Sequence, residues 1–327
     1  MITAIARPNL ALIKHWGKAN EKLNLPAVGS ISVTVDKLMT RTSVKFDRNL
    51  KKDLIKLNNT KVDQRDSKRI IPFMDLVRGM AKDRRFAEVN SLNNFPTAAG
   101  LSSSSADFAA LALSASRAIG LDLNPNDLSV LARRGSGSAA RSIHGGGVEL
   151  VVGDREDGRD SRATPISDTE FWPICIMIAI TAKAPEGVSS RDGMRITAKT
   201  SPYYPIWISS TQTDLSEMRE AILARDITKV GQLSERSCLK MHGAMLSANP
   251  AIIYCNGGTL NVIETVRELR RQGHPVFFTI DAGPQVKIMC EPESKPFVEA
   301  ALKSCSGVVQ LVAMRPGPGA RVVGGEA

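Results

Sequence analysis

The stretch from Asn93 to Ala106 (Asn-Asn-Phe-Pro-Thr-Ala-Ala-Gly-Leu-Ser-Ser-Ser-Ser-Ala) constrains this chain more than any other. A turn is expected at Pro96, and small residues follow it. The stretch then enters a segment rich in alanine and leucine, which is typical of a buried helix. The first N–H groups of a helix lack internal partners, and the helix dipole makes that end attractive to anions. Gly100 would let backbone amides approach a ligand closely. The stretch therefore predicts a phosphate-binding loop or, alternatively, a serine-rich cap of an ordinary helix.

Strands and helices alternate along the 327 residues without a regular βαβ rhythm, which predicts an α+β fold with two domains. A polar stretch at 153–164 precedes a fresh apolar strand, so we place the domains at 1–170 and 171–327. The period-two and helical patterns predict strands at 30–35, 42–46, 54–57, 86–89, 148–152, 174–180, 276–280 and 308–314, and helices at 70–80, 106–119, 128–134, 215–224, 230–245, 260–272 and 296–302.

The net charge of +10 raises the question of nucleic-acid binding. Residues 48–85 hold twelve Lys and Arg against five Asp and Glu, but they lack a pattern of interleaved aromatic residues, with Phe73 alone, and lack Gly-Arg repeats. A solvated basic face that also attracts a small anionic substrate explains this better than an RNA-binding surface. A basic RNA-binding module stays as the remote alternative.

The remaining composition indicates a protein of a reducing compartment. Five cysteines show no metal-ligand spacing and are expected to be buried free thiols. The first residues do not form a signal peptide, and the longest apolar run, 174–180, is much shorter than a membrane span. We therefore expect a cytoplasmic protein without membrane partners.

Several polar residues stand where chemistry is plausible, each with a structural alternative. Lys14 and Lys18 flank Trp16 and could bind anionic oxygens or lie on the surface. Arg141 follows a Gly/Ser turn, which suits capture of a carboxylate or phosphate, and Asp281 ends an apolar strand, where it could act in catalysis or cap a turn. The histidines show no ligand spacing, so no transition metal is expected, and neither the Walker nor the Rossmann fingerprint is present.

Four motifs together resemble one family. The run at 93–104 is similar to the phosphate loop of the galactokinase–homoserine kinase–mevalonate kinase–phosphomevalonate kinase (GHMP) superfamily. This run, with Asn-Leu-Ala-Leu-Ile-Lys-His-Trp-Gly-Lys at 9–18, Gly-Ser-Gly-Ser-Ala-Ala-Arg-Ser at 135–142 and Phe-Thr-Ile-Asp-Ala-Gly-Pro at 278–284, resembles the mevalonate diphosphate decarboxylase family in the same order along nearly the whole chain.

The resemblance implies a GHMP-kinase-like fold, with an N-terminal domain like ribosomal protein S5 domain 2 and a ferredoxin-like C-terminal domain. It implies ATP-dependent decarboxylation of mevalonate 5-diphosphate to isopentenyl diphosphate in isoprenoid biosynthesis, with Mg²⁺ carried by ATP, in a homodimer. Asp281 would be the base or orienting group, Arg141 would hold the substrate carboxylate and Lys14 would neutralise the transferred phosphate. Substrate contacts are implied for His15, Trp16, Lys18, Ser136, Ser138, Ser190 and Arg191. ATP contacts are implied for Asn94, Ala99, Gly100, Leu101, Ser102, Ser103, Ser104 and Ser105.

Two residues depart from the family pattern. His15 stands where tyrosine is usual, and Ser102 stands where glycine or alanine is common. A decarboxylase or 3-kinase acting on mevalonate 5-phosphate or on mevalonate therefore stays open as the nearest alternative. The joint presence of Lys14, Arg141 and Asp281 argues against a relative that is only a kinase, because a kinase expels no carboxylate.

Overall fold

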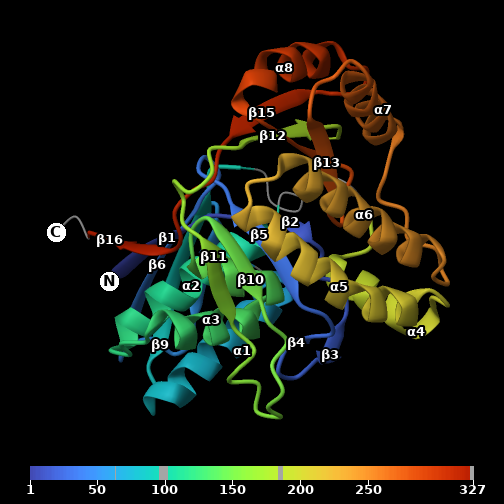
Figure 1. Cartoon of the computed structure of the whole chain (residues 1–327). Helices are drawn as coiled ribbons and strands as arrows, with labels where there is room; N and C mark the ends of the chain where they lie inside the picture. Colours follow the sequence, from blue (N-terminus) through green and yellow to red (C-terminus); the bar gives the residue numbers. More distant parts are fainter. Residues whose placement is uncertain (63, 96–101, 183–186, 325–327) are drawn as a thin grey trace.

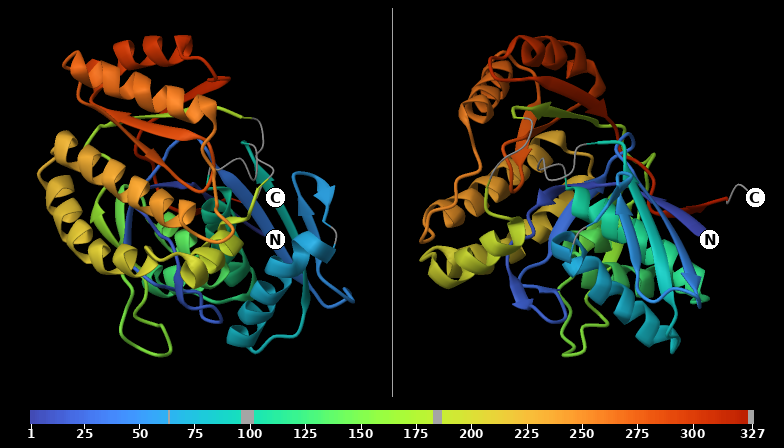
Figure 2. Two further views of the ribbon diagram at one scale, coloured as in Figure 1. Left: turned by 90° about the vertical axis from the view of Figure 1, so that its right-hand side faces the viewer. Right: turned by 180° about the vertical axis from the view of Figure 1, so that it is seen from behind.

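The computed structural model describes residues 1–62, 64–95, 102–182 and 187–324. Its first sheet is largely antiparallel, and only β7 runs parallel to its neighbour β9. The chain end returns to this sheet, since the last strand pairs with the first, and both termini lie at the same side of the molecule (Figure 2). In spatial order the strands are β16 (Arg321–Val323), β1 (Ile2–Ala6), β6 (Thr40–Asp47), β9 (Phe86–Asn93), β7 (Leu54–Leu57) and β8 (Thr60–Lys61).

Helices α1 (Gln64–Ala81), α2 (Ser103–Ile119) and α3 (Pro125–Gly135) pack against the first sheet in one core. The alternation in β6 directs Val44 and Phe46 into that core while the residues between them are more exposed. Small residues let α2 lie close to the sheet, and Gly120 in the left-handed region ends it, as the sequence predicts.

A second sheet continues the N-terminal half, in the order β11 (Ala163–Ser167), β10 (Gly147–Leu150), β5 (Ser30–Thr34) and β2 (Asn9–Ile13). The 3₁₀ helix η1 (Gly137–Ile143) leads into it from the Gly/Ser turn. A small hairpin is formed by β3 (Lys18–Asn20) and β4 (Leu25–Pro26).

The C-terminal half has its own antiparallel sheet, in the order β13 (Val276–Ile280), β14 (Val286–Cys290), β12 (Cys175–Ile180) and β15 (Gln310–Met314). One face packs on α7 (Gly257–Arg271) and α8 (Lys295–Ser304), and a short turn η2 (Pro292–Ser294) precedes α8. The other face packs on α5 (Tyr204–Leu223) and α6 (Ile227–Leu246), which also cover the second sheet (Figure 1). If the helices between β12 and α7 are set aside, the order β12, α7, β13, β14, α8, β15 and this sheet order are those of a ferredoxin-like fold.

The α+β architecture and most predicted elements are confirmed. The short strands β3, β4, β8, β11 and β16 were not predicted, and there are three further differences. The sequence analysis did not predict β14 or α4 (Ser190–Thr200), and α5 begins well before residue 215. The strand β14 was missed because Lys287 interrupts its apolar pattern. The boundary after residue 170, in the connection between β11 and β12, stays a prediction. Within the described ranges, each helix is too short or too polar to cross a lipid bilayer.

Candidate active site

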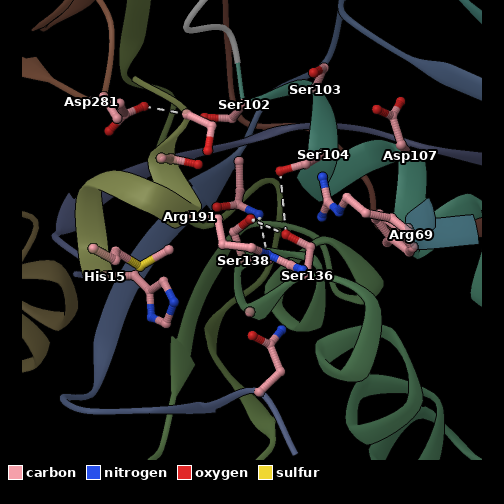
Figure 3. A pocket seen from close by; sticks show the side chains of 18 of the residues that line it. His15, Arg69, Ser102, Ser103, Ser104, Asp107, Ser136, Ser138, Arg191 and Asp281 are labelled. Carbon is pink, nitrogen blue, oxygen red and sulfur yellow. Dashed lines mark hydrogen bonds between the residues drawn. The ribbon is translucent and has the colours of Figure 1, made fainter. Parts of the chain in front are cut away.

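One cavity of about 920 Å³ brings the sequence motifs together. Its walls come from the end of β2, the start of α2, η1, the start of α4 and the turn after β13, so both halves of the chain contribute. Figure 3 shows side chains from these elements pointing into the same space. Among its lining residues are Lys14, His15, Trp16, Lys18, Ser102, Ser103, Ser104, Ser136, Ser138, Arg141, Ser190, Arg191 and Asp281.

The serine run forms the N-terminus of α2. Ser102 precedes the helix in the left-handed region with φ of 58°, a conformation that favours glycine and explains why a small residue is expected there. Ser103 and Ser104 line the cavity, whereas the buried Ser105 donates to the carbonyl of Ser102 at 2.7 Å. Unpaired helix N–H groups at this end suit an anion. The predicted ATP contacts Ala99, Gly100 and Leu101 lie outside the described residues.

Asp281 lies at the end of β13, with both carboxylate oxygens occupied. Lys14 Nζ donates to Oδ1 at 2.5 Å, and Lys287 Nζ lies 3.1 Å from Oδ2. Ser102 Oγ donates to Oδ2 at 3.2 Å from the cavity rim (Figure 3). Burial alone would raise the pKa of Asp281, but the two ammonium groups outweigh it and hold the pKa below its usual range. The carboxylate is therefore ionised at physiological pH.

Lys14 is a buried residue whose position follows from β2. The strand carries it into the interior, where its side chain is 1% exposed and Nζ also donates to the carbonyl of Ala11 at 2.9 Å. A buried ammonium group needs such partners, because it is costly to remove from water. The surface alternative for Lys14 is therefore excluded, and the residue faces Asp281.

Arg141 is held rigidly by the second sheet. Its Nε donates to Ser32 Oγ at 2.7 Å, Nη2 donates to Asn9 Oδ1 at 3.1 Å, and Nη1 donates to Ser30 Oγ. Burial lowers the pKa of Arg141 to about 10, and Asp281 opposes this shift, so the guanidinium is charged at neutral pH. Its remaining N–H groups are available to an anion in the cavity.

A second cationic group consists of Lys18 at the start of β3 and Arg191 at the start of α4. Burial lowers the pKa of Lys18 to about 8, and Arg191 acts in the same direction. Burial also lowers the pKa of His15 to about 3, assisted by Arg141 and Lys18, so the imidazole is neutral. A Cβ on Gly137 would come within 2.6 Å of His15 Nε2, so this close approach needs glycine. Arg191 lies in the first turn of α4, and its neighbour Ser190 lines the same cavity.

The predicted polar residues at the centre of the cavity form a chain of hydroxyls. Ser136 Oγ lies 3.3 Å from both Ser104 Oγ and Ser138 Oγ, which links the start of α2 to η1. Trp16 also borders the cavity but is 2% exposed and packs in the core with Trp207. Trp16 therefore contributes mainly to the wall of the cavity.

Asn94, a predicted ATP contact, points its amide elsewhere. Its Nδ2 donates to the carbonyl of Lys37 and its Oδ1 accepts from the N–H of Met39, each at 2.8 Å. The neighbouring Asn93 lines the cavity instead, and its Oδ1 accepts from Thr40 Oγ1 at 2.6 Å. Asn94 thus stabilises the backbone that leads into β6.

Sequence reasoning missed Lys287, Asp107 and Arg69. Asp107 lines the cavity and accepts from Thr40 Oγ1 at 2.9 Å, and burial raises its pKa to about 6. Arg69 covers the ring of Phe108 at 4.6 Å and lines the same part of the cavity. The available signals were a carboxylate within an alanine-rich helix and a lysine within an apolar strand.

The described residues contain no group of three or more His, Cys, Asp or Glu side chains that could hold a metal ion. Serine hydroxyls and the phosphate oxygens of a nucleotide are suitable Mg²⁺ ligands. This fits the start of α2, where Ser103 and Ser104 are exposed to the cavity.

Comparison with known proteins agrees with this geometry. The model of the diphosphomevalonate decarboxylase-like N-terminal domain matches residues 6–163, and that of the mevalonate 5-diphosphate decarboxylase C-terminal domain matches residues 176–313. The diphosphomevalonate decarboxylase of Homo sapiens is 34% identical over 307 residues, which cover 88% of this chain and 76% of that protein. That of Ganoderma lucidum is 35% identical over 324 residues, covering 92% and 81%.

Solved structures give the same result. One described as "MDDEF in complex with MVAPP, AMPPCP and Magnesium" is 40% identical with a TM-score of 0.93, covering 98% of both chains. The mevalonate diphosphate decarboxylase from Staphylococcus aureus is 37% identical with a TM-score of 0.94, covering 99% of both. The chain therefore belongs to the diphosphomevalonate decarboxylase family.

Proposed function

We propose that this chain catalyses the ATP-dependent decarboxylation of mevalonate 5-diphosphate to isopentenyl diphosphate, ADP, phosphate and carbon dioxide. The observation that carries the proposal is the single cavity in which Asp281, Arg141 and the start of α2 meet. These supply a carboxylate beside a phosphate site and a buried guanidinium for a substrate carboxylate. Curated relatives at 33–35% identity carry the same activity in their names.

The first step is phosphoryl transfer. The tertiary hydroxyl of the substrate would lie beside Asp281 Oδ2, and its oxygen would attack the γ-phosphorus of ATP while the bond to ADP breaks. The ionised Asp281 carboxylate would orient the hydroxyl and take up its proton as the O–P bond forms, and Lys14 would offset charge around the phosphoryl group. Mg²⁺ bound to the nucleotide neutralises its phosphate oxygens.

The second step is elimination. The C3–O bond breaks and releases phosphate, and the electron pair of the bond to the carboxylate forms the double bond as carbon dioxide leaves. Arg141 would hold that carboxylate in the required orientation through its free N–H groups, since its other N–H groups are fixed by Ser30, Ser32 and Asn9. A rigid guanidinium reduces the cost of orienting the substrate.

The diphosphate of the substrate would bind to the second cationic group. Lys18 and Arg191 supply positive charge, Ser190 supplies a hydroxyl, and His15 supplies a neutral ring with Nδ1 unpaired among the described residues. The Ser136–Ser138 pair would contact the mevalonyl part. This group and Asp281 line the same cavity, which suits a substrate that contacts both.

The experiment is an assay of ADP and carbon dioxide with mevalonate, its 5-phosphate and its 5-diphosphate. We expect equal amounts of both products with the diphosphate. ADP without carbon dioxide would support a 3-kinase, and preference for the monophosphate would support the nearest alternative. No turnover with any of the three, together with salt-sensitive RNA binding, would contradict the enzyme and favour the RNA-binding module.

Assembly and location are also proposals. We propose a cytoplasmic homodimer on the basis of the family resemblance. Light scattering of the purified 35.3 kDa chain should give about twice this mass, and a monomeric mass would contradict the dimer.

A further inference from the structure

Lys287 occupies an unusual position for a lysine. It lies in the middle of β14, between β13 and β12, directly opposite Thr279 and Ile178. Its side chain is 2% exposed. Val286 and Ile288 point to the core under α7 and α8, whereas Lys287 shares the opposite face with Met289, which packs toward α5 and α6. A hydrophobic residue would suit this position better for folding alone.

Asp281 already has one cation within hydrogen-bond distance, apart from Lys287. Lys14 Nζ already donates to Oδ1 at 2.5 Å, and it is held in place by the carbonyl of Ala11. Burying an additional ammonium group is unfavourable unless it has a compensating role. The sequence therefore carries a costly residue whose charge is directed at the carboxylate beside the cavity.

The two oxygens of Asp281 have different surroundings. Oδ1 is engaged by Lys14 from the interior, while Oδ2 is engaged by Lys287 at 3.1 Å from the sheet and by Ser102 Oγ at 3.2 Å from the cavity rim. A substrate hydroxyl that enters the cavity would approach Oδ2 from the side where Ser102 now lies. Lys287 would keep its contact during that exchange, because β14 fixes it on the other side.

We propose that Lys287 is a positioning residue that holds Asp281 Oδ2 in the orientation needed by the substrate hydroxyl and keeps the carboxylate ionised. The inference rests on the proposed function. Lys287 acts through Asp281 and does not touch the reacting atoms.

The groups that face Asp281 support this role. They come from several elements: Lys14 after β2, Arg141 in η1, His242 in α6 and Lys287 in β14, while Cys238 in α6 lies near the two lysines. Burial raises the pKa of the Cys238 thiol to about 11 and lowers the pKa of His242 to about 4, so both are neutral near pH 7. Burial lowers the pKa of Lys287 as well, and the Asp281 carboxylate opposes that shift. The ammonium groups therefore dominate the field at Asp281.

The test compares Lys287→Met with Lys287→Gln. The methionine removes both charge and donor, whereas the glutamine keeps a donor without charge. For Lys287→Met we expect kcat to fall about tenfold with little change in substrate KM, the lower end of what a positioned acid–base group contributes. We expect the acid limb of the kcat–pH profile to move to higher pH in both variants, because the carboxylate loses a stabilising charge. Glutamine should restore part of kcat.

Met289→Ala is the matched control. Met289 is fully buried on the same strand and the same face, so its truncation should lower the melting temperature without moving the acid limb. An unmoved acid limb and a kcat within twofold of wild type in folded Lys287→Met would overturn the proposal. If Lys287→Met does not fold, an unmoved acid limb and a kcat within twofold of wild type in Lys287→Gln would overturn the proposal. A wild-type protein that releases no carbon dioxide from any mevalonate would instead contradict the proposed function.

Discussion

Two carboxylates border the same cavity and have opposite electrostatic surroundings. Asp281 lies between the ammonium groups of Lys14 and Lys287, which hold its pKa below the usual range. Asp107 accepts a hydrogen bond from the neutral hydroxyl of Thr40, and burial raises its pKa to about 6. In Figure 3 the serines at the start of α2 lie between them.

The difference shows that burial alone does not decide the charge of a carboxylate. Both groups lose water, which disfavours the ionised form, but Asp281 gains two cations at hydrogen-bond distance, Lys14 and Lys287. Such separation of pKa values is typical of carboxylates with different tasks. We infer that the Asp281 end of the cavity stabilises an ionised carboxylate. At the Asp107 end, the cost of burying the carboxylate is only partly compensated.

The largest effect is expected for Asp281→Asn. Turnover should fall at least a hundredfold, because the amide cannot act as an ionised orienting group or base, while ATP and substrate still bind. Single-turnover release of carbon dioxide and calorimetric binding measure the two effects. Asp122→Asn, at an exposed aspartate paired with Arg117, is the control and should leave turnover unchanged. Near-wild-type rates would remove Asp281 from the mechanism.

Lys14→Met should make Asp281 resemble Asp107. We expect turnover to fall about a hundredfold through loss of charge beside the transferred phosphate. The pKa of Asp281 should rise, because burial is then opposed by fewer cations, so activity that needs the carboxylate should be lost at a higher pH as the solution is acidified. A pH–rate profile measures this, with the exposed Lys303→Met as control. An unshifted acid limb would mean that Lys14 does not set the ionisation of Asp281.

Asp107→Asn tests the other end of the comparison through stability. A native pKa near 6 against about 3.9 in the unfolded chain means that wild-type stability falls as pH rises from about 4 to about 6 and stays lower above that. Asparagine has no proton to lose. The variant should therefore gain about 1–2 kcal/mol at pH 7.5, after allowance for partial solvent exposure, and almost nothing at pH 4. Urea unfolding at both values measures this, and an equal gain at both would contradict the assignment.

The smallest effect is expected for His15→Tyr, which extends the comparison to a base. His15 is buried beside cations, so its pKa is lowered to about 3 and it carries no charge. A tyrosine hydroxyl would add one hydrogen bond to a phosphate, which should change the ratio of kcat/KM for the diphosphate and monophosphate about twofold to tenfold. An unchanged ratio would mean that residue 15 does not read the phosphorylation state.

Local patterns predicted much of the fold and part of the site. The small residues and Gly120 specified α2, the alternation specified β5 and β6, and a short apolar run specified β13, because such signals act over a few neighbours. Motifs also identified Lys14, Arg141 and Asp281 as candidates. Their structural alternatives could not be excluded from the sequence, since the partners lie more than a hundred residues away.

By itself, the sequence determined an α+β chain with a helix N-terminus suited to phosphate and three charged residues in familiar motifs. Tertiary structure alone decided that Lys287 and Lys14 bind one carboxylate, whereas Asp107 accepts from Thr40 and has its pKa raised by burial. The physical reason is that a pKa depends on distances and burial, which the folding of distant strands creates. A lysine in an apolar strand therefore became interpretable only when β14 placed it against Asp281.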